Sequence, residues 1–268
     1  MKNSMKKIAF FDIDGTLTSE IDGSVPASAR EAIRRAREAG NLMFLNTGRC
    51  FQNVEPRFKE VGFDGYVCGC GTHVVIGDSH PLYVTQPADR IHKIIDIARQ
   101  AQVDLLLESR YMVMFDYSHP LTHPVAIRQN QHFIDRGYPM NINIDAPDFT
   151  CDKFVFWYQN QDQLSMVRTL SDEWFDCIDR NETFKEFVPK GYSKATGIQY
   201  VLDYYGLPLE AAYAFGDSNN DLPMLEYVRH SVAMGNSEPA NLKEKVAHVT
   251  TNASDNGIAN ALEELGFF

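Results

Sequence analysis

The amino-acid sequence predicts an α/β fold, a doubly wound parallel sheet into which a separate α+β module is inserted. Short apolar runs alternate with helical segments in the first and last parts of the chain, as in a parallel sheet with helical crossovers. Three of these runs end abruptly in polar clusters, and open α/β sheets bind ligands at the carboxyl ends of their strands. The middle of the chain instead pairs short strands with one another, which indicates a second unit.

The first apolar run, residues 8–11, ends at Asp12 and Asp14, and Gly15 follows at once. Alternate residues of a strand point the same way, so both carboxylates can face one small site. Gly15 allows the backbone to turn sharply and to approach a bound group. Carboxylates this close repel each other, and a divalent cation or a proton shared with substrate would relieve the repulsion. Taken alone, the same stretch fits a helix cap or an Asp-Gly turn about equally well.

The segments after this strand continue the parallel pattern. A helix is expected over residues 26–39, because Pro26 suits a first helical turn and Gly40 suits an end. The second strand runs into the polar cluster Asn46-Thr47-Gly48-Arg49. The expected elements of this part are helices over 26–39 and 51–61, strands at 41–45 and 66–68, and a hairpin of 74–76 and 82–85.

The pattern of predicted elements changes near residue 80, where strands that pair with one another alternate with helices. The expected elements are helices over 88–101, 124–136 and 161–175 and strands at 104–107, 112–117, 153–158, 177–180 and 184–188. The parallel pattern then resumes with helices over 193–205 and 222–228, strands at 211–215 and 231–234, and a strand–helix pair within 248–265. The sequence therefore predicts a core formed by residues 1–79 and 189–268, with an α+β insert over 80–188.

Composition narrows the classes of partner. The formal net charge of −11 argues against a nucleic-acid partner, because binding to the phosphate backbone relies on Lys and Arg. The sequence contains no run of about 18 apolar residues, so it predicts no membrane-spanning helix. Residues 1–7 lack the features of a signal peptide, and a cytoplasmic location is therefore expected. The five cysteines are scattered and lack the spacing of a zinc site, which favours small buried thiols.

Residues at the carboxyl ends of parallel strands meet at one edge of a sheet. The polar clusters of this chain would together place carboxylates, a hydroxyl, backbone amides and an ammonium at that edge. That set suits a phosphoryl group and its metal ion. Four motifs carry a resemblance to the haloacid dehalogenase superfamily, in its order: Asp12-Ile-Asp14-Gly-Thr-Leu, Asn46-Thr47-Gly48-Arg49, Lys194 after Gly-Tyr-Ser, and Gly216-Asp217-Ser-Asn-Asn220-Asp221. The insert between the second and third motifs resembles the type-two cap of the Cof-like phosphatases, which implies a Rossmann-like core and, often, a sugar-phosphate substrate.

The resemblance implies a role for each matching residue. Asp12 would be the nucleophile that forms an aspartyl-phosphate, and Asp14 the general acid and base. Thr47 would hold a phosphate oxygen, and Lys194 would neutralise the nucleophile and the phosphate, with Lys190 as its nearest competitor. The resemblance places phosphate or substrate contacts at Gly48, Arg49 and Asn220, and a Mg²⁺ site at Asp12, Asp14, Asp217 and Asp221.

The same residues also fit purely structural roles. Thr47 fits a helix cap, a lysine in a first helical turn is ordinarily solvated, and Asp217 with Asp221 fits a helix start. The full set of motifs favours a magnesium-dependent phosphatase that hydrolyses a small phosphorylated metabolite, most consistently a sugar phosphate. A phosphomutase of the same superfamily and a catalytically silent sensor of a phosphorylated metabolite are the alternatives.

Overall fold

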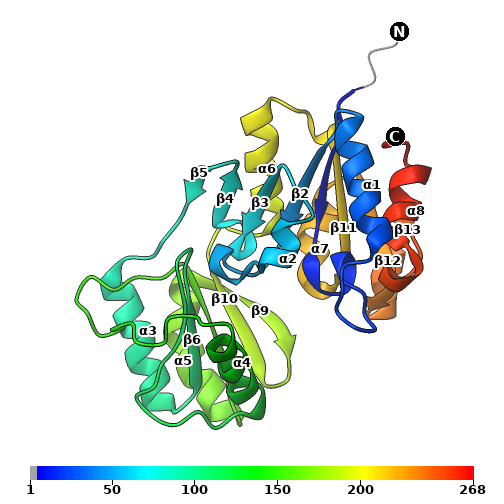
Figure 1. The fold of residues 1–268 in the computed structure, drawn as a ribbon. Coiled ribbons are helices and arrows are strands. Elements are labelled where there is room, and N and C mark those ends of the chain that lie inside the picture. Colours follow the sequence, from blue (N-terminus) through cyan, green and yellow to red (C-terminus); the bar gives the residue numbers. More distant parts are fainter. Residues whose placement is uncertain (1–4) are drawn as a thin grey trace. The chain divides into compact units, whose positions relative to one another are not determined.

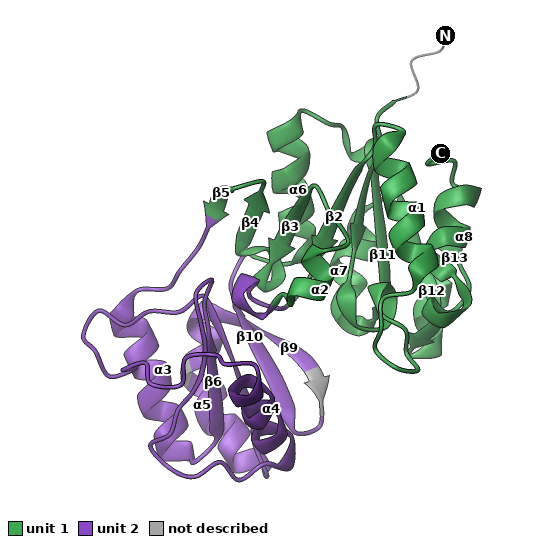
Figure 2. Cartoon of the chain, viewed as in Figure 1, with its two compact units in different colours: residues 1–48, 54–82, 192–268 green, residues 49–53, 83–191 purple. Residues whose placement is uncertain are grey.

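A computed structural model describes residues 5–268; residues 1–4, part of the segment expected not to be a signal peptide, lie outside the described residues. The chain divides into two compact units (Figure 2). The first comprises Met1–Gly48, Val54–Leu82 and Tyr192–Phe268, and the second comprises Arg49–Asn53 and Tyr83–Gly191. Each unit is described by itself, and the expected boundaries at 79/80 and 188/189 stay a prediction.

The first unit is built on an eight-stranded sheet of order β13-β12-β11-β1-β2-β3-β4-β5 (Figure 1). The neighbouring pairs from β13 to β3 are parallel, and β3 pairs with β4 antiparallel. Its strands are β1 (Ile8–Phe11), β2 (Leu42–Asn46), β3 (Gly65–Cys68), β4 (His73–Ile76), β5 (Ser79–Tyr83), β11 (Ala212–Ser218), β12 (His230–Glu238) and β13 (His248–Val249). The α/β class predicted from the sequence, a parallel-sheet core with an α+β insert, is confirmed.

Helices cover this sheet because its central strand β1 is apolar throughout. Every residue of β1 is fully buried, as expected for a strand enclosed on both faces. One face packs against α6 (Lys194–Tyr205) and α7 (Leu222–Tyr227), through a cluster that includes Phe10, Phe44 and Ile198. Helices α1 (Ala27–Glu38) and α8 (Gly257–Glu264) pack against each other and lie together at the side of the sheet in Figure 1.

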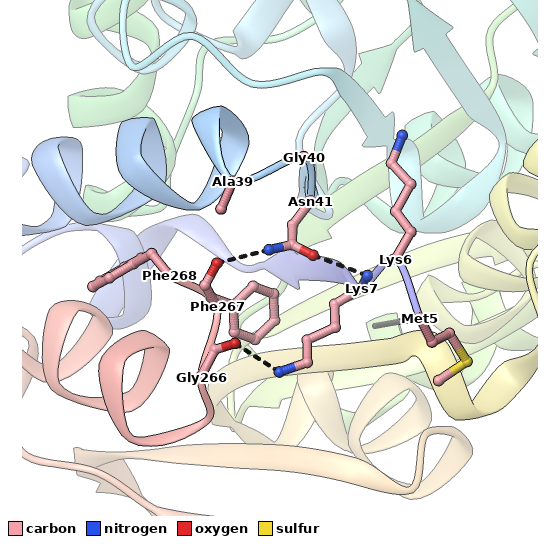
Figure 3. A pocket seen from close by; sticks show the side chains of 9 residues that line it. All are labelled: Met5, Lys6, Lys7, Ala39, Gly40, Asn41, Gly266, Phe267 and Phe268. Atoms are coloured by element: carbon pink, nitrogen blue, oxygen red, sulfur yellow. Dashed lines mark hydrogen bonds between the residues drawn. The ribbon is translucent and has the colours of Figure 1, made fainter. Parts of the chain in front are cut away.

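The first strand and the last residues of the chain are fastened together at the edge where β1 begins (Figure 3). The Lys7 ammonium donates to the carbonyl oxygens of Leu265, at 2.6 Å, and Gly266, at 2.9 Å. The Asn41 side chain donates to the carbonyl of Phe267 at 2.7 Å and accepts from the backbone N–H of Lys7 at 3.0 Å. These contacts lie at the opposite end of β1 from Asp12.

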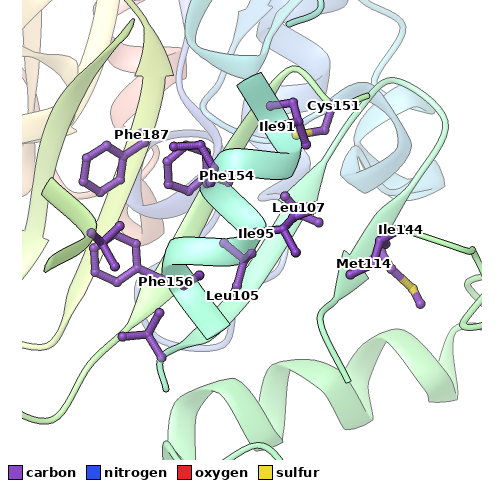
Figure 4. Packing of buried hydrophobic residues seen from close by; sticks show 14 of the residues in the cluster. Ile91, Ile95, Leu105, Leu107, Met114, Ile144, Cys151, Phe154, Phe156 and Phe187 are labelled. Atoms are coloured by element: carbon purple, nitrogen blue, oxygen red, sulfur yellow. The ribbon is translucent and has the colours of Figure 1, made fainter. Parts of the chain in front are cut away.

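The second unit contains a five-stranded sheet of order β7-β6-β8-β10-β9. Its elements are strands β6 (Asp104–Glu108), β7 (Val113–Phe115), β8 (Lys153–Trp157), β9 (Phe175–Asn181) and β10 (Phe184–Pro189), and helices α3 (Ala88–Ala101), α4 (Pro124–Asp135) and α5 (Gln161–Trp174). Alternate residues of β6 and β8 face opposite sides. Leu105, Leu107, Phe154 and Phe156 join the core beneath α3 and α5 (Figure 4), whereas Leu106, Val155 and Trp157 join a second cluster with α4.

Two local predictions are wrong. The helix expected over 51–61 is divided into a short turn, Phe51–Asn53, and α2 (Pro56–Lys59), because Pro56 has no N–H and holds Glu55 extended at ψ 151°. The hairpin closes earlier than expected, since β5 begins at Ser79 directly after the turn at Gly77 and Asp78. The expectation for the cysteines holds: all five are free thiols, four of them buried.

Candidate active site

Strand pairing brings three of the motifs to one edge of the sheet. Phe11 of β1 pairs with Leu45 of β2 on one side and with Phe215 of β11 on the other. The next residue, Asp12, therefore lies beside Asn46 and Gly216. Thr47 and Asp217 come one position later in their segments. The Asp12 backbone N–H also donates to the Phe215 carbonyl at 3.1 Å, which extends the ladder to the point where the chain turns.

Lys194 joins two of these motifs from the start of α6. Ser193 caps this helix and accepts the backbone N–H of Thr196, so Lys194 is its first residue. The lysine side chain is 1% exposed, and its Nζ lies 2.5 Å from Oδ1 of Asp12 and 2.5 Å from Oδ1 of Asp221. A buried ammonium at a helix N-terminus is unfavourable, and the two carboxylates offset this. Lys194 is therefore not a solvated lysine in a first helical turn, which was the alternative to a role in the site.

Asp221 connects this ammonium to the loop after β11. Its Oδ2 accepts the backbone N–H groups of Asp217, at 2.9 Å, and Ser218, at 3.1 Å, while its Oδ1 faces Lys194. A Cβ at Gly216 would lie 2.5 Å from the Asp221 Cβ, so this approach requires glycine. Both oxygens of Asp221 are thus engaged within the protein.

Asp217 faces the turn that follows Asp12. The Thr16 hydroxyl donates to Asp217 Oδ1 at 3.0 Å, and Gly15, at φ 79°, passes so close that a Cβ there would lie 2.3 Å from Asp217 Oδ2. Gly15 is therefore needed both for its positive φ and for the close approach. Burial, then the charges of Asp221 and Asp12, raise the pKa of Asp217 to about 8.

The charges of the cluster do not balance. Burial raises the pKa of Asp12 to about 6, with Lys194 opposing the rise and the charges of Asp221 and Asp14 adding to it. Burial alone would lower the pKa of Lys194, but the carboxylates of Asp12 and Asp221 reverse this and raise it. Asp12, Asp217 and Asp221 offer carboxylate oxygens within 4.8 Å of one another, and one ammonium offsets only part of their charge. Hard oxygen donors carrying excess negative charge fit a divalent cation such as Mg²⁺.

The remaining predicted residues are placed as follows. Asp14 is exposed on the turn after Asp12, whereas Thr47 and Gly48 are buried, and the Thr47 carbonyl accepts the backbone N–H of Cys70 at 3.1 Å. Asn220 accepts a hydrogen bond from the Ser218 hydroxyl. Arg49 belongs to the second unit, where it donates to the carbonyl of Asn53 at 3.5 Å.

Three side chains that support the site were not predicted. Thr16 contacts Asp217, as described above, and stands within the first motif. Asn236 donates to the Gly15 carbonyl at 2.7 Å and accepts the backbone N–H of Ala253 at 2.9 Å, which fastens the turn after Asp12. Asn46 is fully buried and donates to the Lys194 carbonyl at 3.0 Å. Asn236 lies within β12, which carries none of the four motifs, so nothing local in the sequence predicts its contact with Gly15.

Comparison with known proteins agrees with this geometry. A family model described as haloacid dehalogenase-like hydrolase matches residues 9–262. The chain belongs to this family. This haloacid dehalogenase-like hydrolase is 31% identical to YkrA of Bacillus subtilis (strain 168), over 97% of the chain and 98% of the relative. It is 28% identical to the 5-amino-6-(5-phospho-D-ribitylamino)uracil phosphatase YitU of the same organism, over 94% of the chain and 95% of the relative.

The structure of the hydrolase resembles that of the phosphatase BT1666 from Bacteroides thetaiotaomicron, with a TM-score of 0.84 and 26% identity, over 100% of this chain and 98% of the other. The fold, with its cap, is also that of the solved subclass IIB sugar phosphatase BT4131, with a TM-score of 0.83 and 21% identity, over 98% of this chain and 100% of the other. The protein is a phosphoric monoester hydrolase, as its phosphatase relatives indicate. No helix among residues 5–268 has the length and apolar character to cross a bilayer.

Proposed function

We propose that the protein is a magnesium-dependent phosphatase that hydrolyses a phosphorylated sugar or polyol through an aspartyl-phosphate on Asp12. One observation carries the proposal: the Asp12 carboxylate lies 2.5 Å from the Lys194 ammonium and also belongs to a cluster in which oxygens of Asp12, Asp217 and Asp221 are within 4.8 Å of one another. A nucleophile in that position contacts a fixed cation and belongs to a carboxylate cluster that could hold a second one. At a pKa of about 6, Asp12 is mostly ionised at pH 7 and able to attack.

The reaction then runs in two balanced steps. A carboxylate oxygen of Asp12 attacks phosphorus, the bond from phosphorus to the substrate oxygen breaks, and Asp14 donates a proton to that leaving oxygen. Asp14 next takes a proton from water, the water oxygen attacks the aspartyl-phosphate, and the bond from phosphorus to Asp12 breaks.

The other residues hold the groups that react. Bound Mg²⁺, held by the carboxylates of Asp12 and Asp217 and the backbone carbonyl of Asp14, would supply positive charge to the phosphate oxygens. The Thr47 hydroxyl would hold a phosphate oxygen, with further contacts from Gly48 and Asn220.

Asp221 also lies within the carboxylate cluster, so it is close enough to be a metal ligand itself. Its Oδ1 already faces Lys194, and its Oδ2 already accepts two backbone N–H groups. We therefore assign Asp221 to orienting Lys194 and the loop that carries Asp217, with the metal contacts left to the other carboxylates.

A phosphorylated polyol or sugar is the substrate class that the observations favour. The name of YitU describes a phosphate carried on a ribityl chain, and this relative aligns along nearly the whole chain. The net charge of −11 disfavours polyanionic substrates such as nucleic-acid ends. A small substrate of this kind has one phosphate and few other charges.

Phosphate release tests the proposal. p-Nitrophenyl phosphate should be hydrolysed with Mg²⁺ and not with excess EDTA, and release without a bisphosphate activator argues against a phosphomutase. The value of kcat/KM is then compared for D-ribitol 5-phosphate, hexose 6-phosphates, nucleotides and phosphopeptides. A tenfold preference for nucleotides or phosphopeptides, only about 1.4 kcal/mol of discrimination, would overturn the substrate class.

A further inference from the structure

The side chain of Asn236 joins two backbone segments that lie far apart in the sequence. Its amide nitrogen donates to the Gly15 carbonyl at 2.7 Å, and its oxygen accepts the backbone N–H of Ala253 at 2.9 Å. One contact needs a donor and the other needs an acceptor. A carboxamide offers both at once, whereas a carboxylate offers only acceptors. Both ends of the Asn236 amide are therefore committed to these two segments.

The backbone that carries Asn236 is itself held in place. The N–H of Gly235 donates to the Thr251 carbonyl at 3.0 Å, and the Lys243 ammonium donates to the Gly235 carbonyl. A Cβ at Gly235 would lie 2.6 Å from the backbone nitrogen of Asn252, so only glycine lets these two segments come so close. The Asn236 side chain therefore projects from a fixed support at the end of β12.

The contact of Asn236 with Gly15 bears on the direction of Asp14. The Ile13 carbonyl accepts the backbone N–H of Thr18 at 2.9 Å and its hydroxyl at 3.0 Å, and the Gly15 N–H donates to that hydroxyl oxygen at 3.2 Å. Asp14 lies between these anchored groups, and its side chain is exposed. Packing restrains an exposed side chain little, so the direction of the carboxylate depends on the backbone. Thr18 holds that backbone from within the turn, and Asn236 holds it from outside.

We propose that Asn236 is a positioning residue for the donation of a proton by Asp14 to the leaving oxygen of the substrate. This inference rests on the proposed function, in which the bond from phosphorus to the substrate oxygen breaks as Asp14 gives up its proton. General acid catalysis contributes about 10²–10⁴-fold, and the acid has to lie within hydrogen-bond reach of the leaving oxygen. Without the Asn236 contact the Gly15 peptide is free to rotate, and the Asp14 carboxyl group spends less time in that position.

Two aryl esters of similar shape separate this role from a general loss of structure. Phenolate is a strong base, with a pKa close to the value of about 10 for tyrosine, and needs a proton as it leaves. p-Nitrophenolate is a much weaker base and leaves without one. At saturating Mg²⁺, Asn236→Ala should lower kcat/KM for phenyl phosphate roughly three- to thirtyfold more than for p-nitrophenyl phosphate. Since kcat/KM reports only the steps up to release of the phenol, the later hydrolysis of the aspartyl-phosphate does not enter.

Two further variants complete the test. Asn236 is half-buried, and Asn236→Asp keeps its size and the acceptor for Ala253 but replaces the donor with oxygen. It should show the same selective loss even where Asn236→Ala unfolds. Asn260→Ala is the matched control, because the Asn260 amide donates to Thr251 at 2.9 Å and to Asp255 at 3.3 Å, on either side of Ala253. Its ratio of kcat/KM between the two esters should stay within about twofold of the parent ratio.

Thermal melting identifies the folded variants, and the two esters then decide. Equal losses for both esters in folded Asn236→Asp, or no loss for either, would overturn the inference. A selective loss of the same size in Asn260→Ala would assign the effect to the segment of residues 251–255 and overturn it as well. Failure of the proposed function looks different, because the parent protein would then release phosphate from neither ester.

Discussion

The Lys194 ammonium lies 2.5 Å from Oδ1 of Asp221, and the other oxygen of that carboxylate accepts two backbone N–H groups of the loop that carries Asp217. One carboxylate thus fixes both the lysine and the loop. The charge of Lys194 and the position of Asp217 are therefore coupled through a residue that we do not expect to touch phosphate.

Asp221→Asn should destabilise the protein and lower its activity together. An amide would present its N–H₂ or its weaker oxygen to Lys194, and the ion pair would be lost, although Asp12 still faces the ammonium. We expect a loss of roughly 1–3 kcal/mol in the free energy of unfolding, measured by urea denaturation. Asp78→Asn, at an exposed carboxylate in the turn before β5, is the matched control and should change stability by less than about 0.5 kcal/mol. Equal midpoints for the two variants would contradict the anchoring role.

Asp12→Asn should abolish turnover and leave the fold intact. An amide does not attack phosphorus usefully, and Lys194 keeps Asp221 as a partner in the variant. Phosphate release should fall below roughly a hundredth of the parent rate, a generous limit against the factor of about 10⁶ or more that enzymes supply. Thermal melting of the same sample checks the fold. A well-folded variant that retains more activity would move the nucleophile elsewhere.

Asp217→Ala should weaken the dependence on Mg²⁺ and the activity together, because one of the two proposed carboxylate ligands is lost. The measurement is a titration of Mg²⁺ against the rate of p-nitrophenyl phosphate hydrolysis, with the expected half-saturation point at a higher concentration. Thr16→Val is a useful companion, since it removes only the hydrogen bond to Asp217 and should shift the curve less. A half-saturation point unchanged in Asp217→Ala would assign the ligand to Asp221.

The sequence predicts the central sheet well because its signals are local. An apolar run such as Ile8–Phe11 is buried on both faces, and the polar residues that follow it mark the ligand edge. The contacts of Asn236 with Gly15 and of Asn46 with Lys194 join residues more than 140 positions apart. Asn46 stands within the second motif, but nothing local in the sequence pairs it with Lys194, and Asn236 stands in no motif. The break within 51–61 has a local signal, because Pro56 restricts the residue before it and cannot continue a helix that starts at Phe51.

The pH dependence of stability should carry a contribution from Asp152 in the second unit. Its side chain is buried, and the Tyr83 hydroxyl donates to its Oδ1 at 2.7 Å. Burial first, and then the charge of Glu108, raise the pKa of Asp152 from 3.8 to about 7, despite that hydrogen bond. The folded state therefore holds this proton over a range in which the unfolded chain has lost it. The contribution to stability is fully present below about pH 4 and declines as the pH rises through 7.

Asp152→Asn cannot ionise and keeps an oxygen that accepts from Tyr83. Its advantage in unfolding free energy over the parent should grow between pH 5 and pH 8, with an upper limit of roughly 4 kcal/mol. Asp116→Asn is the control of opposite sign: burial alone would raise the pKa of Asp116, but the Arg99 guanidinium and the hydrogen bonds from Ser118 together reverse this and lower it. That variant should lose stability by a similar amount at both pH values, since the carboxylate is ionised in the folded and unfolded states throughout this range. Urea denaturation of the three proteins at pH 5 and pH 8 makes the comparison, and a pH-independent difference between parent and Asp152→Asn would show that Asp152 is already ionised in the folded protein.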